Sequence, residues 1–132
     1  MLTEKDYCDY ETCVALKEKG FPQHITEEAY IIDNYGEDEY DIGERLPIPL
    51  IPDYMDDVAA PTIYEAQKWL REKENIIVEV FVDDDSDTPI TYNIYKDREC
   101  VCHHHGKYWS VEEWSEALSE GIKEAIKHIE II

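Results

Sequence analysis

The chain has 132 residues, of which 32 are Asp or Glu and only 12 are Lys or Arg, so its formal net charge at pH 7 is −20. This excess of acids argues against direct binding to nucleic acids or anionic membranes, because both need basic residues to neutralise phosphates. Hydrophobic residues make up 43% of the chain, which is enough for one core and argues against wholesale disorder. With no signal peptide and no apolar run of membrane-spanning length, we expect a cytoplasmic monomer with reduced cysteines.

A short helix is expected first. Asp9 is a suitable N-cap, and Cys13 and Leu16 recur at helical spacing on its apolar side. Gly20 favours the left-handed backbone that ends many helices, and Phe21 follows where it can pack back onto Leu16. The sequence therefore predicts a helix of about three turns that ends at Gly20.

An acidic, proline-containing segment at about residues 34–60 is predicted to be irregular. Residues 29–33 read as a short strand, residues 34–36 as a turn, and residues 40–42 as the return strand of a hairpin. Eleven acids and one base, Arg45, lie between Glu27 and Asp57. About half of the net charge is therefore concentrated here.

The second half of the chain alternates helix and strand more regularly. Thr62 and Glu65 form a capping box before a helix that closes near residue 75. Residues 76–82 and 90–95 alternate like paired strands around an acidic turn at residues 83–87, and residues 99–103 read as a third strand. A second capping box, Ser110 and Glu113, opens a last helix, in which Gly121 would allow close approach to the sheet.

Both of these helices carry an apolar stripe that predicts core packing. The order helix, strand, strand, helix, strand, strand, a further strand and helix indicates an α+β fold, with antiparallel hairpins packed with three helices in a single domain of residues 1–132. The stripe residues are Ile63, Ala66, Trp69 and Leu70 in the first, and Val111, Trp114, Leu118, Ile122, Ile126 and Ile129 in the second.

Three segments carry a family resemblance. They are residues 9–21 (DYETCVALKEKGF), residues 60–73 (APTIYEAQKWLREK), and residues 116–118 with 122–127 (EAL and IKEAIK). They resemble a group of uncharacterised short proteins from gut-bacterial genomes, many of them in prophages or other mobile elements. The resemblance implies a mobile-element context and assigns no activity and no site residues.

The densest set of metal-ligand side chains lies in residues 100–105. Thiols and imidazoles are the ligands of structural zinc, so one hypothesis is a zinc-binding module, and no other cofactor is expected. The alternative interpretation is that Cys100 and Cys102 share one face of an edge strand and that the histidines form an exposed loop, because neighbouring strand residues face opposite ways. The five candidate ligands are Cys100, Cys102, His103, His104 and His105.

No catalytic motif is present, so we predict a protein that is not an enzyme. Cys13 falls on an apolar helix stripe, where a thiol usually packs. Residues 83–87 begin like a calcium-binding loop, but Thr88 and Ile94 replace its glycine and its bidentate glutamate, which favours a solvated turn.

The charge favours a function by protein–protein interaction, with an unknown and basic partner. The alternatives are a DNA mimic that inhibits a nucleic-acid-binding protein, the metal-binding module above, and acidity that serves solubility alone. Tyrosines among the carboxylates, with a tryptophan before the last helix, would supply contact area. The predicted partner surface is Tyr35, Glu37, Asp38, Glu39, Tyr40, Asp41, Glu44 and Trp109.

Overall fold

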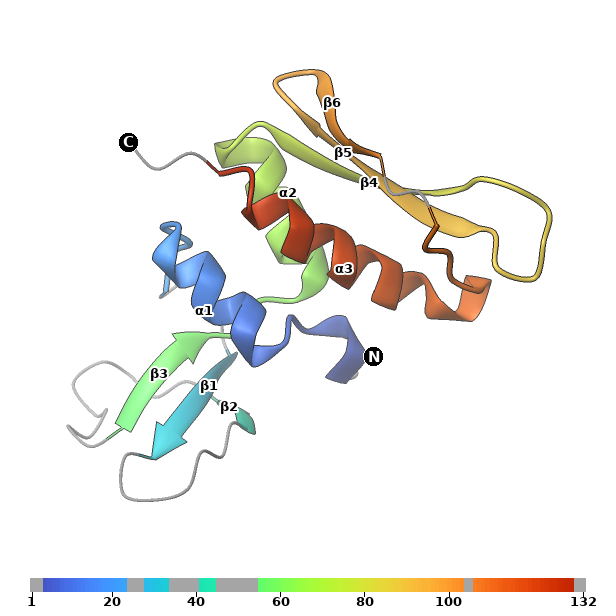
Figure 1. The fold of residues 1–132 in the computed structure, drawn as a ribbon. Helices are drawn as coiled ribbons and strands as arrows, with labels where there is room; N and C mark the ends of the chain where they lie inside the picture. The colour runs from blue at the N-terminus through green and yellow to red at the C-terminus, as the bar shows by residue number, and fades with distance from the viewer. Residues whose placement is uncertain (1–3, 24–27, 34–40, 45–54, 104–105, 130–132) are drawn as a thin grey trace. The chain divides into compact units, whose positions relative to one another are not determined.

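A computed structural model describes residues 4–23, 28–33, 41–44, 55–103 and 106–129 (Figure 1). The chain divides into two compact units, one of residues 7–61 and the other of residues 1–6 with residues 62–132. The described residues hold three α-helices and two antiparallel three-stranded sheets. The predicted α+β class, with antiparallel hairpins and three helices, is confirmed.

The unit of residues 7–61 contains α1 (Tyr10–Glu18), β1 (Glu28–Asp33), β2 (Asp41–Glu44) and β3 (Met55–Ala59). Asp9 caps α1 as predicted, because its carboxylate accepts a hydrogen bond from the Thr12 amide at 2.8 Å. Gly20 has a φ of +96°, and the Phe21 amide donates to the Leu16 carbonyl at 2.9 Å. The predicted helix end is therefore confirmed as a Schellman motif.

Strand β3 lies in the segment that the sequence predicts to be irregular. Its partner is β1, which lies between β2 and β3 and pairs antiparallel with both. The Gln23 side chain contacts the last residue of β3. It accepts a hydrogen bond from the Ala59 amide at 2.9 Å and donates one to the Phe21 carbonyl at 2.9 Å. Two aspartates in five residues give β3 little intrinsic strand propensity, so pairing with a remote strand decides its structure.

The other unit begins with η1 (Glu4–Asp6) and continues with α2 (Ile63–Lys73), β4 (Ile76–Val82), β5 (Ile90–Lys96) and β6 (Glu99–His103). It ends with η3 (Val111–Glu113) and α3 (Trp114–Ile126). The strands form an antiparallel meander in the order β4-β5-β6, so the predicted third strand is confirmed. Both predicted capping boxes are present, at Thr62 and at Ser110.

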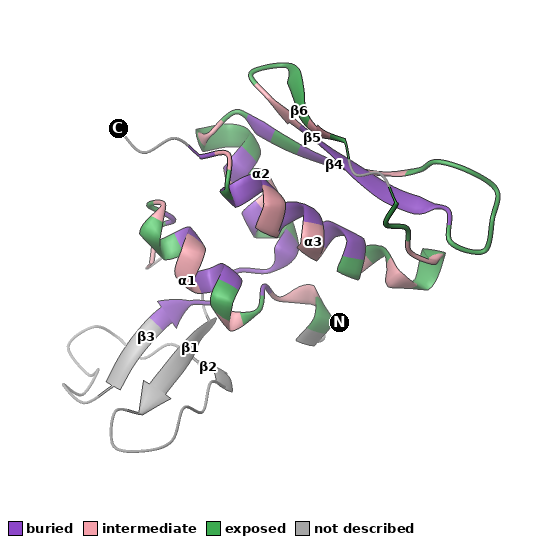
Figure 2. Cartoon of the chain, viewed as in Figure 1, coloured by how far each residue is buried: buried purple, intermediate pink, exposed green. Residues whose placement is uncertain are grey.

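The core of this unit lies between the sheet and α3 (Figure 2). Gly121 of α3 sits against the sheet, where an added Cβ would be 2.6 Å from Val78 Cγ1 and 3.3 Å from Tyr92 Cγ. The predicted close approach at Gly121 is therefore confirmed. The buried side chains that meet in this layer include Ile76, Val78, Ile90, Tyr92 and Ile94 from the strands and Leu118, Ile122 and Ile126 from the helix.

The first turn of the last helix does not follow its predicted stripe. Val111 is 62% exposed and Trp114 is 38% exposed, so the prediction that they pack in the core is wrong. Val111 lies in a 3₁₀ turn of residues 111–113, whose three residues per turn shift its side chain away from the face that Leu118 and Ile122 use. Trp114 is the first residue of α3 and precedes the first buried residues of that helix, Ala117 and Leu118, by one turn. The helix thus presents apolar side chains to solvent at its start.

Candidate functional site

Most of the predicted partner surface lies outside the described residues, namely Tyr35, Glu37, Asp38, Glu39 and Tyr40. Asp41 and Glu44 lie at the two ends of β2, where they pair with Ile31 and Glu28 of β1.

Trp109 lies in the other unit and is half-buried. Its backbone exchanges two hydrogen bonds with Ile90, at 2.8 and 3.0 Å, and its ring centroid is 6.0 Å from that of Tyr92. Trp109 therefore extends the sheet beside β5 and is held in place by it.

The thiols of β6 are separated by a bulge. The pairing register shifts between Ile94 and Tyr95, so that Cys102 lies opposite Ile94 and Cys100 lies opposite Tyr95. Ile94 and Tyr95 are consecutive strand residues and face opposite sides, so the interpretation that the two cysteines share one face is wrong. Burial, and then the nearby Glu124 of α3, raise the pKa of Cys102.

The zinc hypothesis gains no geometric support from the ligands that the structure describes. His103 pairs with Asn93, and His104 and His105 lie outside the described residues. Among the residues that are described, no group of three or more His, Cys, Asp or Glu side chains is arranged to hold a metal ion. Zinc binding by residues 100–105 stays a prediction.

Two acidic segments meet at one end of this unit. Residues 83–95 contain four Asp, residues 108–122 contain four Glu, and neither segment contains Lys or Arg. The Tyr108 hydroxyl donates to Asp83 Oδ2 at 3.0 Å, and the pairing of Trp109 with Ile90 joins the segments a second time. We call this surface the acidic end; it comprises Asp83, Asp84, Asp85, Asp87, Glu112, Glu113 and Glu116, with the apolar side chains of Val82, Tyr108, Val111 and Trp114.

Local hydrogen bonds lower the pKa of two of these carboxylates, Asp84 and Glu113. The side chain and amide of Ser86 hold the pKa of Asp84 below its ordinary value, and the amide of Ser86 donates to Asp84 Oδ1 at 2.9 Å. The amide and hydroxyl of Ser110 likewise lower the pKa of Glu113, which accepts from them at 3.0 and 2.9 Å. Asp83 raises the pKa of Tyr108 through their hydrogen bond. At neutral pH the surface is therefore strongly negative.

Apolar groups are exposed among these charges. Val82 is 64% exposed, and Tyr108 is also exposed, alongside Val111 and Trp114. The basic residues nearby are Lys107, next to Tyr108 in sequence, and Lys5, whose charge helps to lower the pKa of Glu113. Sequence reasoning placed Trp114 in the core and missed this combination; the signal was the density of glutamates around the tryptophan.

A second arrangement lies on the sheet face opposite α3. Glu79 of β4 is directly across from Asn93 of β5, which is directly across from His103 of β6. Asn93 is 8% exposed; its amide group donates to the Tyr95 hydroxyl at 3.4 Å and its carbonyl oxygen contacts His103 Nδ1. The Tyr95 hydroxyl in turn donates to Glu79 Oε1 at 3.5 Å. No sequence pattern predicted this series of hydrogen bonds, because cross-strand register creates it.

Comparisons with known proteins identify no relative: no family model, no curated protein and no solved structure matches the chain. The resemblance to short prophage-associated proteins therefore stays a prediction. Within the described ranges, none of the helices is both long and apolar enough to cross a bilayer.

Proposed function

We propose that the protein acts by binding a basic protein partner through its acidic end, without catalysing a reaction. The observation that carries the proposal is the exposure of Trp114 and Val111 on a helix start surrounded by carboxylates. Tryptophan is among the side chains that contribute most to binding at protein interfaces, and exposed apolar groups rimmed by polar ones are typical of docking surfaces.

The carboxylates make this surface selective for positively charged partners. Asp84 and Glu113 each have a lowered pKa, so protonation does not relieve the negative charge near neutrality. A surface of one sign accelerates encounter with a partner of the opposite sign and disfavours acidic ones. A Lys- or Arg-rich segment with a few apolar side chains therefore fits the acidic end.

The DNA-mimic alternative needs carboxylates in a row at phosphate-like spacing. Strands β4, β5 and β6 carry only Glu79 and Glu99 as acids, and the acids of the acidic end lie on a loop and at a helix start. On β4, β5 and β6 and at the acidic end, the described carboxylates form no such row, so we base the proposal on docking.

The test is the affinity for a fluorescent lysine homopeptide, measured by anisotropy for the wild-type protein and for Trp114→Ala. We expect the variant to bind roughly tenfold more weakly, as expected for loss of an aromatic anchor. Binding should also weaken as salt is raised, because the carboxylates are exposed.

Two exposed valines provide a matched control. Val111→Ala removes apolar surface from the acidic end, and Val101→Ala removes it from β6. We expect only the first to weaken binding. Equal affinities for the wild type, Trp114→Ala and Val111→Ala, in variants with unchanged circular dichroism, would contradict the proposal.

A further inference from the structure

The second face of the β4-β5-β6 sheet differs from the face that α3 covers. Directly opposed residues share a face, so the pairs Ile77–Tyr95, Glu79–Asn93 and Phe81–Thr91 lie on one side of β4 and β5. The buried residues Val78 and Tyr92 lie on the other side, against Gly121 of α3. Among the described elements of this unit, the helices pack on the Val78 side (Figure 1).

Glu79 is an exposed carboxylate in an apolar and aromatic frame. Its neighbours along β4 on the same face are Ile77, which is 43% exposed, and Phe81, which is partly exposed. Tyr95 lies diagonally across on β5 and donates its hydroxyl hydrogen to Glu79 Oε1. Because Asn93 donates to the same hydroxyl, Tyr95 is oriented toward the carboxylate.

This arrangement matches one kind of side chain. A guanidinium group pairs with a carboxylate through two parallel N–H groups and stacks on aromatic rings, whereas an ammonium group is a compact and strongly hydrated charge. Aliphatic and aromatic neighbours limit the water around Glu79 once a side chain lies over it. The frame therefore favours arginine over lysine.

We propose that Glu79, Phe81 and Tyr95 form an arginine-binding site on the sheet face opposite α3, where Ile77 and Glu79 of β4 are exposed, and that this site engages an arginine of the same basic partner. This inference rests on the proposed function, which supplies the basic protein partner. The choice of an arginine side chain as the occupant of the site rests on charge complementarity with Glu79. Phe81 leads through Val82 into the loop at Asp83, so the arginine site adjoins the acidic end along one strand. One basic segment could thus contact both surfaces.

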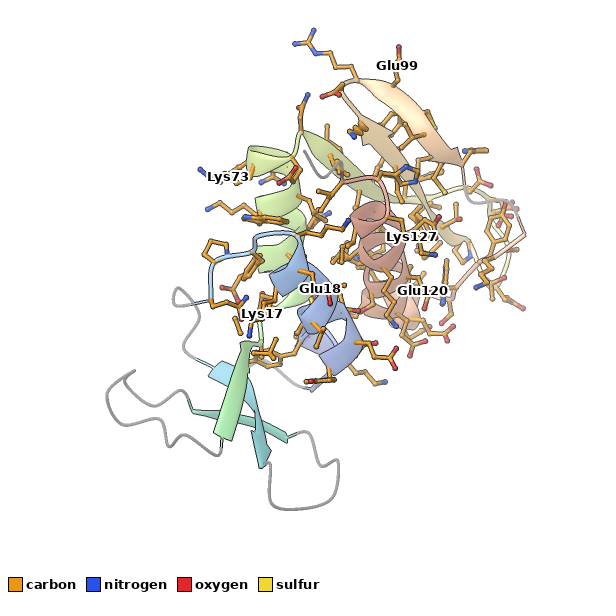
Figure 3. All side chains as sticks on the ribbon, turned by 60° about the vertical axis from the view of Figure 1, so that its left-hand side comes forward. Lys17, Glu18, Lys73, Glu99, Glu120 and Lys127 are labelled. Carbon is orange, nitrogen blue, oxygen red and sulfur yellow. The ribbon has the colours of Figure 1, made fainter. Side chains whose placement is uncertain are left out.

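The experiment compares fluorescent arginine and lysine homopeptides of equal length against the same protein at moderate salt. We expect the wild type to bind the arginine peptide roughly two- to fivefold more tightly than the lysine peptide. Glu79→Gln and Phe81→Leu should abolish this preference. Glu99→Gln is the matched control, since it removes one exposed charge from the same sheet at the far end of β6 (Figure 3) and should leave the preference unchanged.

The outcomes separate the two proposals. Equal wild-type affinity for both peptides would overturn the arginine site, and so would equal losses of preference in Glu79→Gln and Glu99→Gln. If Trp114→Ala then still weakens both peptides, docking at the acidic end stands alone. If Trp114→Ala changes nothing while Glu79→Gln and Phe81→Leu abolish the preference, the arginine site stands and the acidic-end proposal is wrong.

Discussion

The two ends of the unit formed by residues 1–6 and 62–132 contain similar numbers of glutamates but differ in how many of them form ion pairs with lysines. At the end where α2 and α3 finish, glutamates pair with lysines one helical turn away: Lys68 with Glu72, Lys123 with Glu120, and Lys127 with Glu124. Figure 3 shows Glu120 on α3, Lys127 just beyond the end of α3, and Lys73 at the end of α2. We call this region the paired end. At the acidic end are Glu112, Glu113 and Glu116, and residues 108–122 contain no Lys or Arg.

This difference shows that the net charge is not spread evenly over the fold. Exposed ion pairs contribute little to stability, but they cancel the field that a partner would meet. At the acidic end, where Lys5 and Lys107 are nearby, the carboxylates outnumber the basic residues and surround exposed apolar side chains. The two ends therefore predict different responses to mutation.

The largest effect is expected for Gly121→Ala, which disturbs the packed layer that both ends share. The new methyl group would meet Val78 Cγ1 at 2.6 Å, and overpacking of this kind costs about 1–3 kcal/mol. Thermal unfolding followed by circular dichroism would measure the loss, with Ser119→Ala in the same helix as the control. If hydrogen exchange at the two ends then changed unequally, the ends would not share one cooperative core.

The next effect concerns the paired end. The Lys96 ammonium donates to the His128 carbonyl at 2.7 Å and so satisfies a backbone group just beyond the end of α3. Lys96→Met keeps the aliphatic stem and should lower the unfolding free energy by about 1 kcal/mol. Urea denaturation would test this, with Lys73→Met as a control of equal charge change. Equal losses in both variants would show that charge, and not the hydrogen bond, matters.

A smaller effect on stability is expected when a glutamate–lysine ion pair is introduced at the acidic end. Ser119→Lys places a lysine three residues after Glu116, the spacing of the Glu120–Lys123 and Glu124–Lys127 pairs. We expect stability to rise by about 0.5 kcal/mol and affinity for the lysine homopeptide to fall. Ser119→Gln has a similar helix propensity without the charge. Peptide binding that weakened equally with glutamine would remove charge as the cause.

The smallest effect is a pH dependence at the start of α3. Hydrogen bonds from Ser110 lower the pKa of Glu113 from its ordinary value of 4.5 in the folded protein. A lowered folded-state pKa stabilises above that ordinary value, and the stabilisation is lost as pH falls through the folded pKa. Ser110→Ala keeps the amide hydrogen bond, which is the larger cause, and removes the one from the hydroxyl. Melting temperatures of the wild type and Ser110→Ala should therefore differ at pH 6 by the hydroxyl's part and converge under acid conditions. A constant difference across that range would assign the effect of Ser110 to its uncharged hydrogen bonds.

Local signals predicted the helices well. The cap at Asp9, the Schellman ending at Gly20 and both capping boxes involve groups a few residues apart, so the sequence specifies them directly. Alternation also predicted β4 and β5. In β4 a buried face repeats every second residue over Ile76 and Val78, whereas residues 90–94 of β5 are all buried.

The errors arose where distant groups decide the local structure. Strand β3 forms because it pairs with β1. The bulge in β6 places Cys100 and Cys102 on opposite faces of the sheet. The start of the last helix was predicted from a 3.6-residue repeat, but it opens with a 3₁₀ turn, and Val111 and Trp114 are exposed. The acidic end includes this helix start, which is one reason why sequence reasoning favoured another region.

The sequence by itself determined the charge, the positions of the helix caps and the α+β class, because composition and contacts between near neighbours fix them. Only the tertiary structure decided which acids share a surface with Trp114, and that Glu79 lies beside Tyr95 and Phe81. Those juxtapositions depend on strand register and on packing between segments far apart in the chain. A shift of one residue in register would move Glu79 to the opposite face of the sheet.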